Sequence, residues 1–213
     1  MENILKKIIN KKKEKIINYK KQYSENEVLS YIKNYKNFIN FKDKMKKNTL
    51  ENKISIIAEI KKASPSAGLI IKNYDPVNIA EIYSKNNATC LSVLTEEDFF
   101  LGNLLHISKI KQKVNLPILC KDFFIDPYQV PLAKNFGADC ILIILSAVDK
   151  ILAKDLYQAA NQLMIDNAIT LFITDFVGYQ AISQNVSNSD TTSTQTGYGT
   201  MGRNLSFREM AVN

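Results

Sequence analysis

The sequence predicts an α/β fold with parallel strands, and two observations carry this prediction. Short, continuous apolar runs recur along the chain from residue 54 onward, and stretches with helical spacing of apolar residues separate them. Continuous apolar runs are typical of strands that are buried on both faces, and the intervening helices supply the crossovers that parallel strands require. The distance between successive runs fits one βα unit each time.

The predicted elements alternate in order along the chain. Amphipathic helices are expected within residues 1–53, and a first strand at 54–60 is followed by the turn-like sequence Ser-Pro-Ser-Ala-Gly. Later strands are expected at 89–94, 117–120, 140–145 and 169–173. The helices are expected at 77–84, 104–113, 128–136 and 151–164.

The lack of a glycine-rich loop distinguishes between two α/β architectures. No G-x-G-x-x-G or G-x-x-x-x-G-K-[ST] sequence follows a predicted strand, which disfavours a doubly wound nucleotide-binding sheet and favours a (β/α) barrel. After residue 53 the chain has room for about six βα units, whereas eight need about 200 residues or more. We therefore expect a barrel that lacks its last two units. Its open edges would expose interior side chains such as Ile57, Leu119 and Leu142 and allow association.

The positive charge of the chain is concentrated at one end. The net charge is +7, and residues 1–53 alone hold 15 lysines and 6 acidic residues. These lysines alternate with apolar residues, which predicts amphipathic helices with solvated outer faces rather than a nucleic-acid interface. We therefore expect an N-terminal helical extension over 1–53 and a barrel domain over 54–213. The segment 183–200 has almost no apolar side chains and is expected to be disordered.

The composition argues against several other classes of protein. No apolar run approaches the roughly 18–20 residues of a membrane span, and the N-terminus resembles no secretory signal, so a cytoplasmic location is expected. Cys90, Cys120 and Cys140 lack metal-ligand or disulfide spacing and are expected to be small buried residues. His106 is the single histidine, which excludes His-based triads and His-rich metal sites. We expect it in a loop or at a helix start, without a chemical role.

Three charged residues stand at the ends of predicted strands, where a barrel places its active site. Glu59 and Lys61 are two positions apart, so strand alternation directs both toward the barrel mouth, and Lys121 ends the third strand. Two lysines and a carboxylate in a half-buried mouth can transfer protons and hold an acidic substrate, because repulsion and desolvation lower the pKa of a lysine. The alternative is that all three are solvated surface charges.

Four segments with specific motifs resemble the indole-3-glycerol phosphate synthase family. They read IIAEIKKASPSAGLI (56–70), CLSVLTEEDFFLGN (90–103), PILCKDFFIDPYQV (117–130) and GADCILII (137–144). Their order and spacing also resemble that family, whose members belong to tryptophan biosynthesis and fold as TIM-type (β/α)8 barrels with N-terminal helices. The resemblance covers residues 1–145 and is weak after them.

The resemblance implies ring closure of 1-(2-carboxyphenylamino)-1-deoxyribulose 5-phosphate, with loss of carbon dioxide and water. It implies that Lys121 is the general acid at the substrate carbonyl, that Lys61 pairs with the anthranilate carboxylate and that Glu59 orients these lysines. Further contacts are implied for Ser64, with phosphate, and for the apolar residues Pro65, Phe100, Phe123 and Leu142. The implied substrate is a small phosphorylated carboxylate, no cofactor or metal is needed, and the family is monomeric.

The C-terminal part departs from the family pattern. The family has a catalytic glutamate at the end of its fifth strand, whereas NAITLFITDF contains none, and Asp175 is its nearest carboxylate. The segment GTMGRNLSF (199–207) resembles the end of the sixth strand and keeps Arg203 and Leu205 as candidate substrate contacts, but Met201 stands in place of an asparagine. A catalytically impaired remnant that only binds ligand is therefore a second hypothesis. A basic interaction module at 1–53 is a third.

Overall fold

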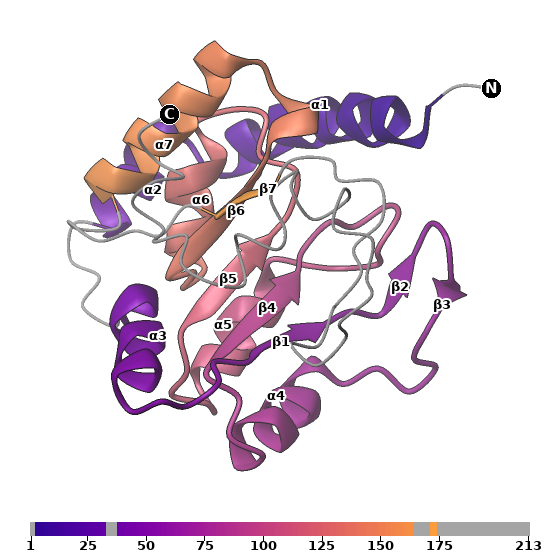
Figure 1. The fold of residues 1–213 in the computed structure, drawn as a ribbon. Helices are drawn as coiled ribbons and strands as arrows, with labels where there is room; N and C mark the ends of the chain where they lie inside the picture. The colour runs from indigo at the N-terminus through magenta and orange to yellow at the C-terminus, as the bar shows by residue number, and fades with distance from the viewer. Residues whose placement is uncertain (1–2, 33–37, 164–170, 174–213) are drawn as a thin grey trace, which may run out of the picture. The chain divides into compact units, whose positions relative to one another are not determined.

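A computed structural model describes residues 3–32, 38–163 and 171–173 of the chain. Five parallel strands form one sheet in the order β1-β4-β5-β6-β7 (Figure 1). Their bounds are β1 Ile57–Ile60, β4 Cys90–Leu94, β5 Ile118–Lys121, β6 Cys140–Ile144 and β7 Leu171–Ile173. This arrangement confirms the predicted α/β fold with parallel strands. The first strand is shorter than expected, because residues 54–56 precede it in an irregular segment.

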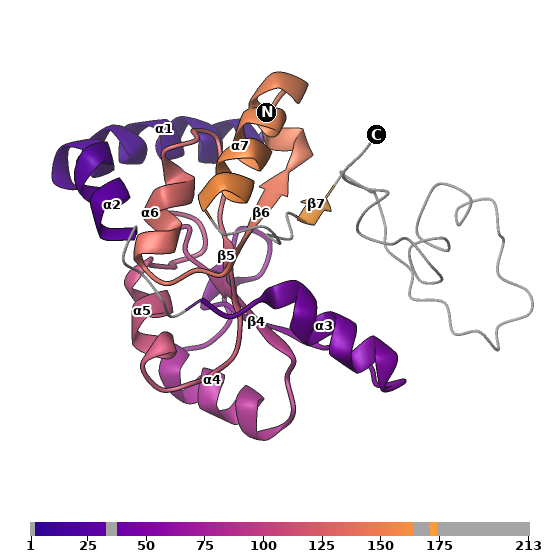
Figure 2. The ribbon, with the colours of Figure 1, turned by 90° about the vertical axis from the view of Figure 1, so that its left-hand side faces the viewer.

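A helix comes after each of β1, β4, β5 and β6 in the chain, and these helices cover one face of the sheet (Figure 2). They are α4 Pro76–Lys85, α5 Leu105–Lys111, α6 Gln129–Asn135 and α7 Lys150–Leu163, with a short 3₁₀ turn, η1, at Leu145–Ala147. Alternate strand residues point toward these helices and form the main apolar core, because side chains in a strand alternate between its faces. Those residues are Ile60, Leu91, Val93, Ile118, Cys120, Ile141 and Ile143.

Three helices precede the sheet, at α1 Ile4–Gln22, α2 Glu25–Ile32 and α3 Phe41–Leu50. Helix α3 lies apart from the outer helices (Figure 2), and its Phe41 is buried in a second apolar cluster with strand residues of the opposite face. That cluster contains Cys90, Leu119, Cys140 and Leu142. The expectation that Leu119 and Leu142 are exposed at open edges is therefore wrong. Both lie on inner strands of the sheet, and both are at most 4% exposed.

Helix α1 runs beside the segments that follow β4 and β5, and its charged face is only partly solvated. Lys15 and Tyr19 both bind the carboxylate of Glu97, and Lys20 pairs with Asp126 at 2.6 Å. Lys12 is 4% exposed and pairs with Asp122 at 2.6 Å. The expectation that the lysines of the extension are all solvated is therefore wrong for Lys12, because helix periodicity does not reveal a buried acidic partner.

The Ser-Pro-Ser-Ala-Gly turn belongs to a small antiparallel hairpin. Strand β2 spans Ala63–Ser64 and pairs with β3 at Gly68–Leu69. Gly68 has φ +63°, a conformation that a residue without a Cβ adopts at little cost. The sequence predicted the turn but not the pairing, because two-residue strands carry no alternation pattern.

Several other expectations concern particular residues. Cys90, Cys120 and Cys140 are free and buried, which confirms their interpretation. No helix among the described residues is long and apolar enough to cross a membrane. The boundary at residue 53 stays a prediction, as does the number of βα units. Asp175, Arg203, Leu205 and the segment 183–200 lie outside the described residues.

Candidate active site

Glu59 lies between two lysines at the ends of β1 and β5, the two strands that flank β4 in the sheet. Its Oε1 is 2.6 Å from Lys61 Nζ, and its other oxygen accepts a short hydrogen bond from Lys121 Nζ. The register of the sheet brings Glu59 and Lys121 together. Glu59 pairs with Ser92 on β4, and Leu94, two residues further along β4, pairs with Lys121 on β5. The structure thus brings together the three residues that the sequence singled out, which we call the Glu59 triad.

The Glu59 triad is half-buried, with side-chain exposures of 29% for Glu59, 30% for Lys61 and 33% for Lys121. Burial disfavours the ionised form of Glu59, but the hydrogen bonds from Lys121 and Lys61 outweigh it and hold the pKa of this carboxyl below its ordinary 4.5. The carboxylate therefore stays charged at neutral pH. The three groups together carry one excess positive charge, which suits an anionic ligand.

Replacing Glu59 with Gln is expected to lower the free energy of unfolding by about 1–2 kcal/mol, because two lysines lose their shared charge-assisted acceptor. Because the pKa of Glu59 is lower in the folded state than in the unfolded chain, its carboxylate stabilises the fold fully above pH 4.5. This stabilisation is lost as the pH falls through the pKa of Glu59 in the folded state. Urea unfolding of both proteins between pH 3 and 7 measures the difference. A difference that persists undiminished to the lowest pH would contradict the shift.

A tight loop follows β4 and presents Phe100. The carboxylate of Glu96, which is 1% exposed, accepts hydrogen bonds from the backbone amides of Asp98, Phe99 and Phe100. Burying a carboxylate is costly unless donors surround it, and here three backbone amides do so. The loop places the Phe100 ring 6.4 Å from that of Phe123, centroid to centroid. Two of the residues expected to form an aromatic wall are therefore neighbours.

Gly102 closes this loop. Its amide donates to the Glu96 carbonyl oxygen at 2.7 Å, and a Cβ on Gly102 would press against the carbonyl of Leu94 and lie 2.8 Å from that of Glu96. Backbone atoms cannot move aside as a flexible side chain can, so this position requires glycine.

Gly102→Ala is expected to destabilise the fold by about 1–3 kcal/mol, through overpacking against backbone. Gly68→Ala is the control, because a Cβ at Gly68 meets nothing within 4 Å and only its positive φ is strained. Thermal unfolding of both variants measures the effect. Equal losses would show that crowding at Gly102 is not the cause.

A buried polar network lies next to Lys121. Asp122 is 7% exposed, accepts from the Thr95 hydroxyl at 2.7 Å and pairs with Lys12 of α1. Burial works against the charge on Lys12, but Asp122 outweighs it and raises the pKa of this lysine. Thr95, Glu96 and Asp122 follow β4 and β5 just as the triad residues stand at strand ends. All three are buried, and their side chains bind neighbouring groups of the protein.

Three other residues that were expected to contact the substrate, Ser64, Pro65 and Leu142, form no hydrogen bond or ion pair with the triad among the described residues. The Ser64 hydroxyl accepts from the Ala67 amide at 3.1 Å inside the hairpin, and Pro65 is exposed there. Leu142 is 2% exposed and packs in the inner cluster with Phe41. The structure records no contact of these three residues with the triad among the described residues. Sequence reasoning missed the role of Lys12, which no motif signals.

The described residues contain no group of three or more His, Cys, Asp or Glu side chains that could hold a metal ion. Ammonium and carboxylate groups such as those of the triad can transfer protons and pair with charges.

Comparisons with known proteins agree with this arrangement. The family model for indole-3-glycerol phosphate synthase matches residues 5–171. Similar proteins named indole-3-glycerol phosphate synthase include one from Aliarcobacter butzleri, 43% identical over 76% of this chain and 62% of the relative. Another, from Zymomonas mobilis subsp. pomaceae, is 39% identical over 82% of this chain and 66% of the relative. A third, from Bordetella pertussis, is 38% identical over 78% and 63%.

These matches span less than two thirds of the length of those relatives. They nevertheless cover most of this chain, and the family match at residues 5–171 includes the strands β1, β4, β5 and β6 with the Glu59 triad. The family folds as a TIM barrel, in agreement with the predicted fold class. The chain therefore belongs to the indole-3-glycerol phosphate synthase family.

Proposed function

We propose that the Glu59 triad performs the proton transfers of an indole-3-glycerol phosphate synthase. The reaction would close the indole ring of 1-(2-carboxyphenylamino)-1-deoxyribulose 5-phosphate, with loss of carbon dioxide and water. The observation that carries the proposal is the carboxylate of Glu59 held between Lys61 and Lys121. It supports an acid catalyst whose position is fixed before the substrate arrives.

Each group has a separate task in this proposal. Lys121 donates a proton to the carbonyl oxygen of the substrate as the new carbon–carbon bond forms, so that this oxygen becomes a hydroxyl rather than an alkoxide. In the later dehydration this hydroxyl takes up a second proton and leaves as water. Lys61 binds the anthranilate carboxylate, which then leaves as carbon dioxide. Glu59 holds both ammonium groups in place and balances one of their charges.

The aromatic part of the substrate requires an apolar wall. Phe100 and Phe123 lie close together and are both partly exposed, which supports their role beside the anthranilate ring. Ser64 and Leu142 are proposed as further contacts on the family pattern alone, together with Pro65, Arg203 and Leu205. We also propose that residues 1–53 act as a helical extension of the barrel, as their ion pairs with the segments after β4 and β5 support.

Ligand binding without turnover is the second candidate function, because NAITLFITDF, the segment in which the family has a catalytic glutamate, contains no glutamate. The two functions differ in a direct assay. The purified chain is incubated with the substrate, indole formation is followed by fluorescence, and binding of a reduced, non-cyclising substrate analogue is measured by titration calorimetry. Binding with product supports the synthase, and binding without product supports the second function. A chain that neither binds nor converts would overturn both.

A further inference from the structure

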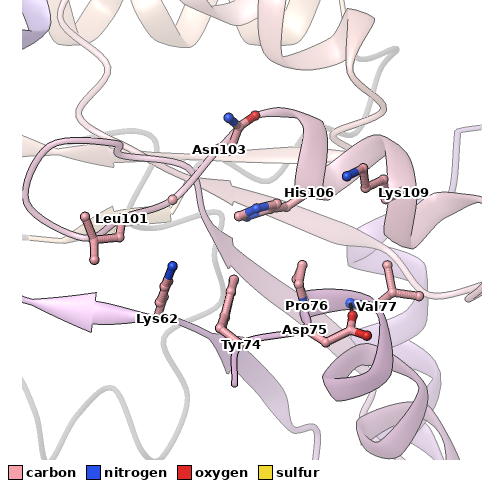
Figure 3. A pocket seen from close by; sticks show the side chains of 10 residues that line it. Lys62, Tyr74, Asp75, Pro76, Val77, Leu101, Asn103, His106 and Lys109 are labelled. Atoms are coloured by element: carbon pink, nitrogen blue, oxygen red, sulfur yellow. Dashed lines mark hydrogen bonds between the residues drawn. The ribbon is translucent and has the colours of Figure 1, made fainter. Parts of the chain in front are cut away.

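A groove lies beside β1, and none of the triad residues lines it. It encloses about 550 Å³ between the segment that leads into α4 and the segment that leads into α5 (Figure 3). Its lining includes Lys62, Tyr74, Leu101, Asn103, His106 and Lys109. Lys61 and Lys62 are adjacent in the sequence, but they belong to different sites. Lys61 binds Glu59, whereas Lys62 lines the groove.

Three cationic or titratable groups border the groove. Lys62 and Lys109 form no ion pair with an acidic residue within the described part of the chain. Burial lowers the pKa of His106, and the positive charges of Lys109 and Lys62 lower it further. The two lysines are thus close enough to act on the same imidazole. Asp75 is the acidic residue of the lining.

The acceptors along the groove are only partly occupied. One oxygen of the Asp75 carboxylate, Oδ1, caps α4 by accepting from the amides of Val77 and Asn78, at 2.9 and 3.1 Å, and the other oxygen makes no hydrogen bond to a described residue. The side-chain oxygen of Asn103 accepts from the Leu105 amide at 2.8 Å, so its amide group remains as a donor.

Donors, in contrast, lack partners. The hydroxyl of Tyr74 and Nδ1 of His106 are buried and make no hydrogen bond to a described residue, although their rings lie 5.5 Å apart. A hydroxyl is a donor, and Nδ1 is one whenever it carries the imidazole proton. Buried polar groups of this kind are uncommon unless a ligand or water satisfies them. The groove therefore offers ammonium and amide donors, with the buried Tyr74 hydroxyl and His106 imidazole behind them, against one free carboxylate oxygen, that of Asp75.

We propose that this groove binds the phosphate group of a small molecule, at a site separate from the Glu59 triad. A phosphate group carries between one and two negative charges at neutral pH, and its unprotonated oxygens accept hydrogen bonds, so it complements two lysines that have no acidic partner among the described residues and the donors beside them. The volume exceeds that of inorganic phosphate and falls in the range of small-ligand pockets, which leaves room for an organic remainder against Leu101.

The single histidine makes a site-specific test possible. The full chain, purified without a histidine tag, is titrated with inorganic phosphate, ribose 5-phosphate or sodium chloride at equal ionic strength, and the imidazole Cε1–H signal is followed by NMR. Both phosphates are expected to give saturable shifts and to raise the pKa of His106, because a bound anion offsets the neighbouring ammonium charges. Tighter binding of ribose 5-phosphate would identify an organic phosphate as the ligand, and equal binding would identify the free ion.

Variants locate the site. Lys109→Gln and Tyr74→Phe are each expected to weaken phosphate binding at least fivefold, whereas Lys121→Gln in the triad leaves it unchanged. Thermal unfolding confirms that each variant is folded, and Lys113→Gln controls for the loss of a nearby exposed charge. Equal, non-saturating shifts with all three salts would overturn the proposal. So would a saturable response that survives Lys109→Gln and disappears in Lys121→Gln, because the anion would then occupy the triad. Neither outcome bears on synthase activity, which the fluorescence assay tests separately.

Discussion

Lys12→Met is expected to lower the free energy of unfolding by about 3–5 kcal/mol, the cost of leaving one member of a buried ion pair without its partner. Lys12 and Asp122 are 4% and 7% exposed, and their charged atoms are 2.6 Å apart. Methionine preserves most of the volume of the lysine side chain but leaves the Asp122 carboxylate in a buried site. Thr95 and the Phe123 amide still donate to it, yet they are neutral donors.

Two variants separate the ion pair from other effects of the change. Lys13→Met replaces the adjacent, exposed lysine and is expected to change stability by less than about 0.5 kcal/mol. The double variant Lys12→Met/Asp122→Asn removes both charges and should recover part of the loss, because no unpaired carboxylate remains. Urea unfolding measures all four proteins. A Lys12→Met loss no larger than that of Lys13→Met would show that α1 does not depend on this pair.

This ion pair also connects the N-terminal helix to the candidate active site. Asp122 directly follows Lys121, and the oxygen that pairs with Lys12 also accepts from the Phe123 amide at 2.7 Å. The buried carboxylate therefore fixes the backbone on which both Lys121 and Phe123 stand. Lys12 holds that carboxylate from a helix more than a hundred residues away in the sequence, so α1 acts as part of the support of the site.

Apolar periodicity predicted the architecture because the inner strands β4, β5 and β6 are buried on both faces. The runs at 89–94 and 140–145 coincide with β4 and β6 within one residue, and the one polar residue inside β4, Ser92, is itself buried. The first run was placed too early, because apolar side chains at Ile54 and Ile56 continue the pattern although they are 86% and 50% exposed. A local sequence pattern does not show which apolar side chains become buried against other parts of the protein.

The candidate site was predictable to the extent that it depends on strand alternation. Glu59 and Lys61 share a face because they are two positions apart on one strand, and Lys121 joins them through parallel register. The position of Phe41 in the inner cluster and the burial of Lys12 both depend on contacts between elements far apart in the sequence. Neither leaves a signal in its own segment, so sequence patterns alone could not predict them.

Lys121→Met is expected to reduce the proposed synthase activity about 10²–10⁴-fold, the usual contribution of a positioned general acid. Lys61 cannot replace it, because its ammonium group is bound to the other oxygen of Glu59 and would be engaged by the substrate carboxylate. The fold should survive, since Lys121 is one-third exposed and Glu59 keeps Lys61 as a partner.

The form of the loss distinguishes a general acid from a structural lysine. A group that acts only in the transition state lowers kcat and kcat/KM together, whereas one that merely binds substrate raises KM. Steady-state rates of indole-ring formation are therefore compared among the wild type, Lys121→Met and Lys113→Met, the last of which replaces an exposed lysine outside the triad. We expect Lys113→Met to match the wild type and Lys121→Met to retain its affinity for the reduced analogue within a few-fold. Turnover by Lys121→Met at the wild-type rate would refute its assignment as the acid, because no other described cation contacts Glu59 from the same side.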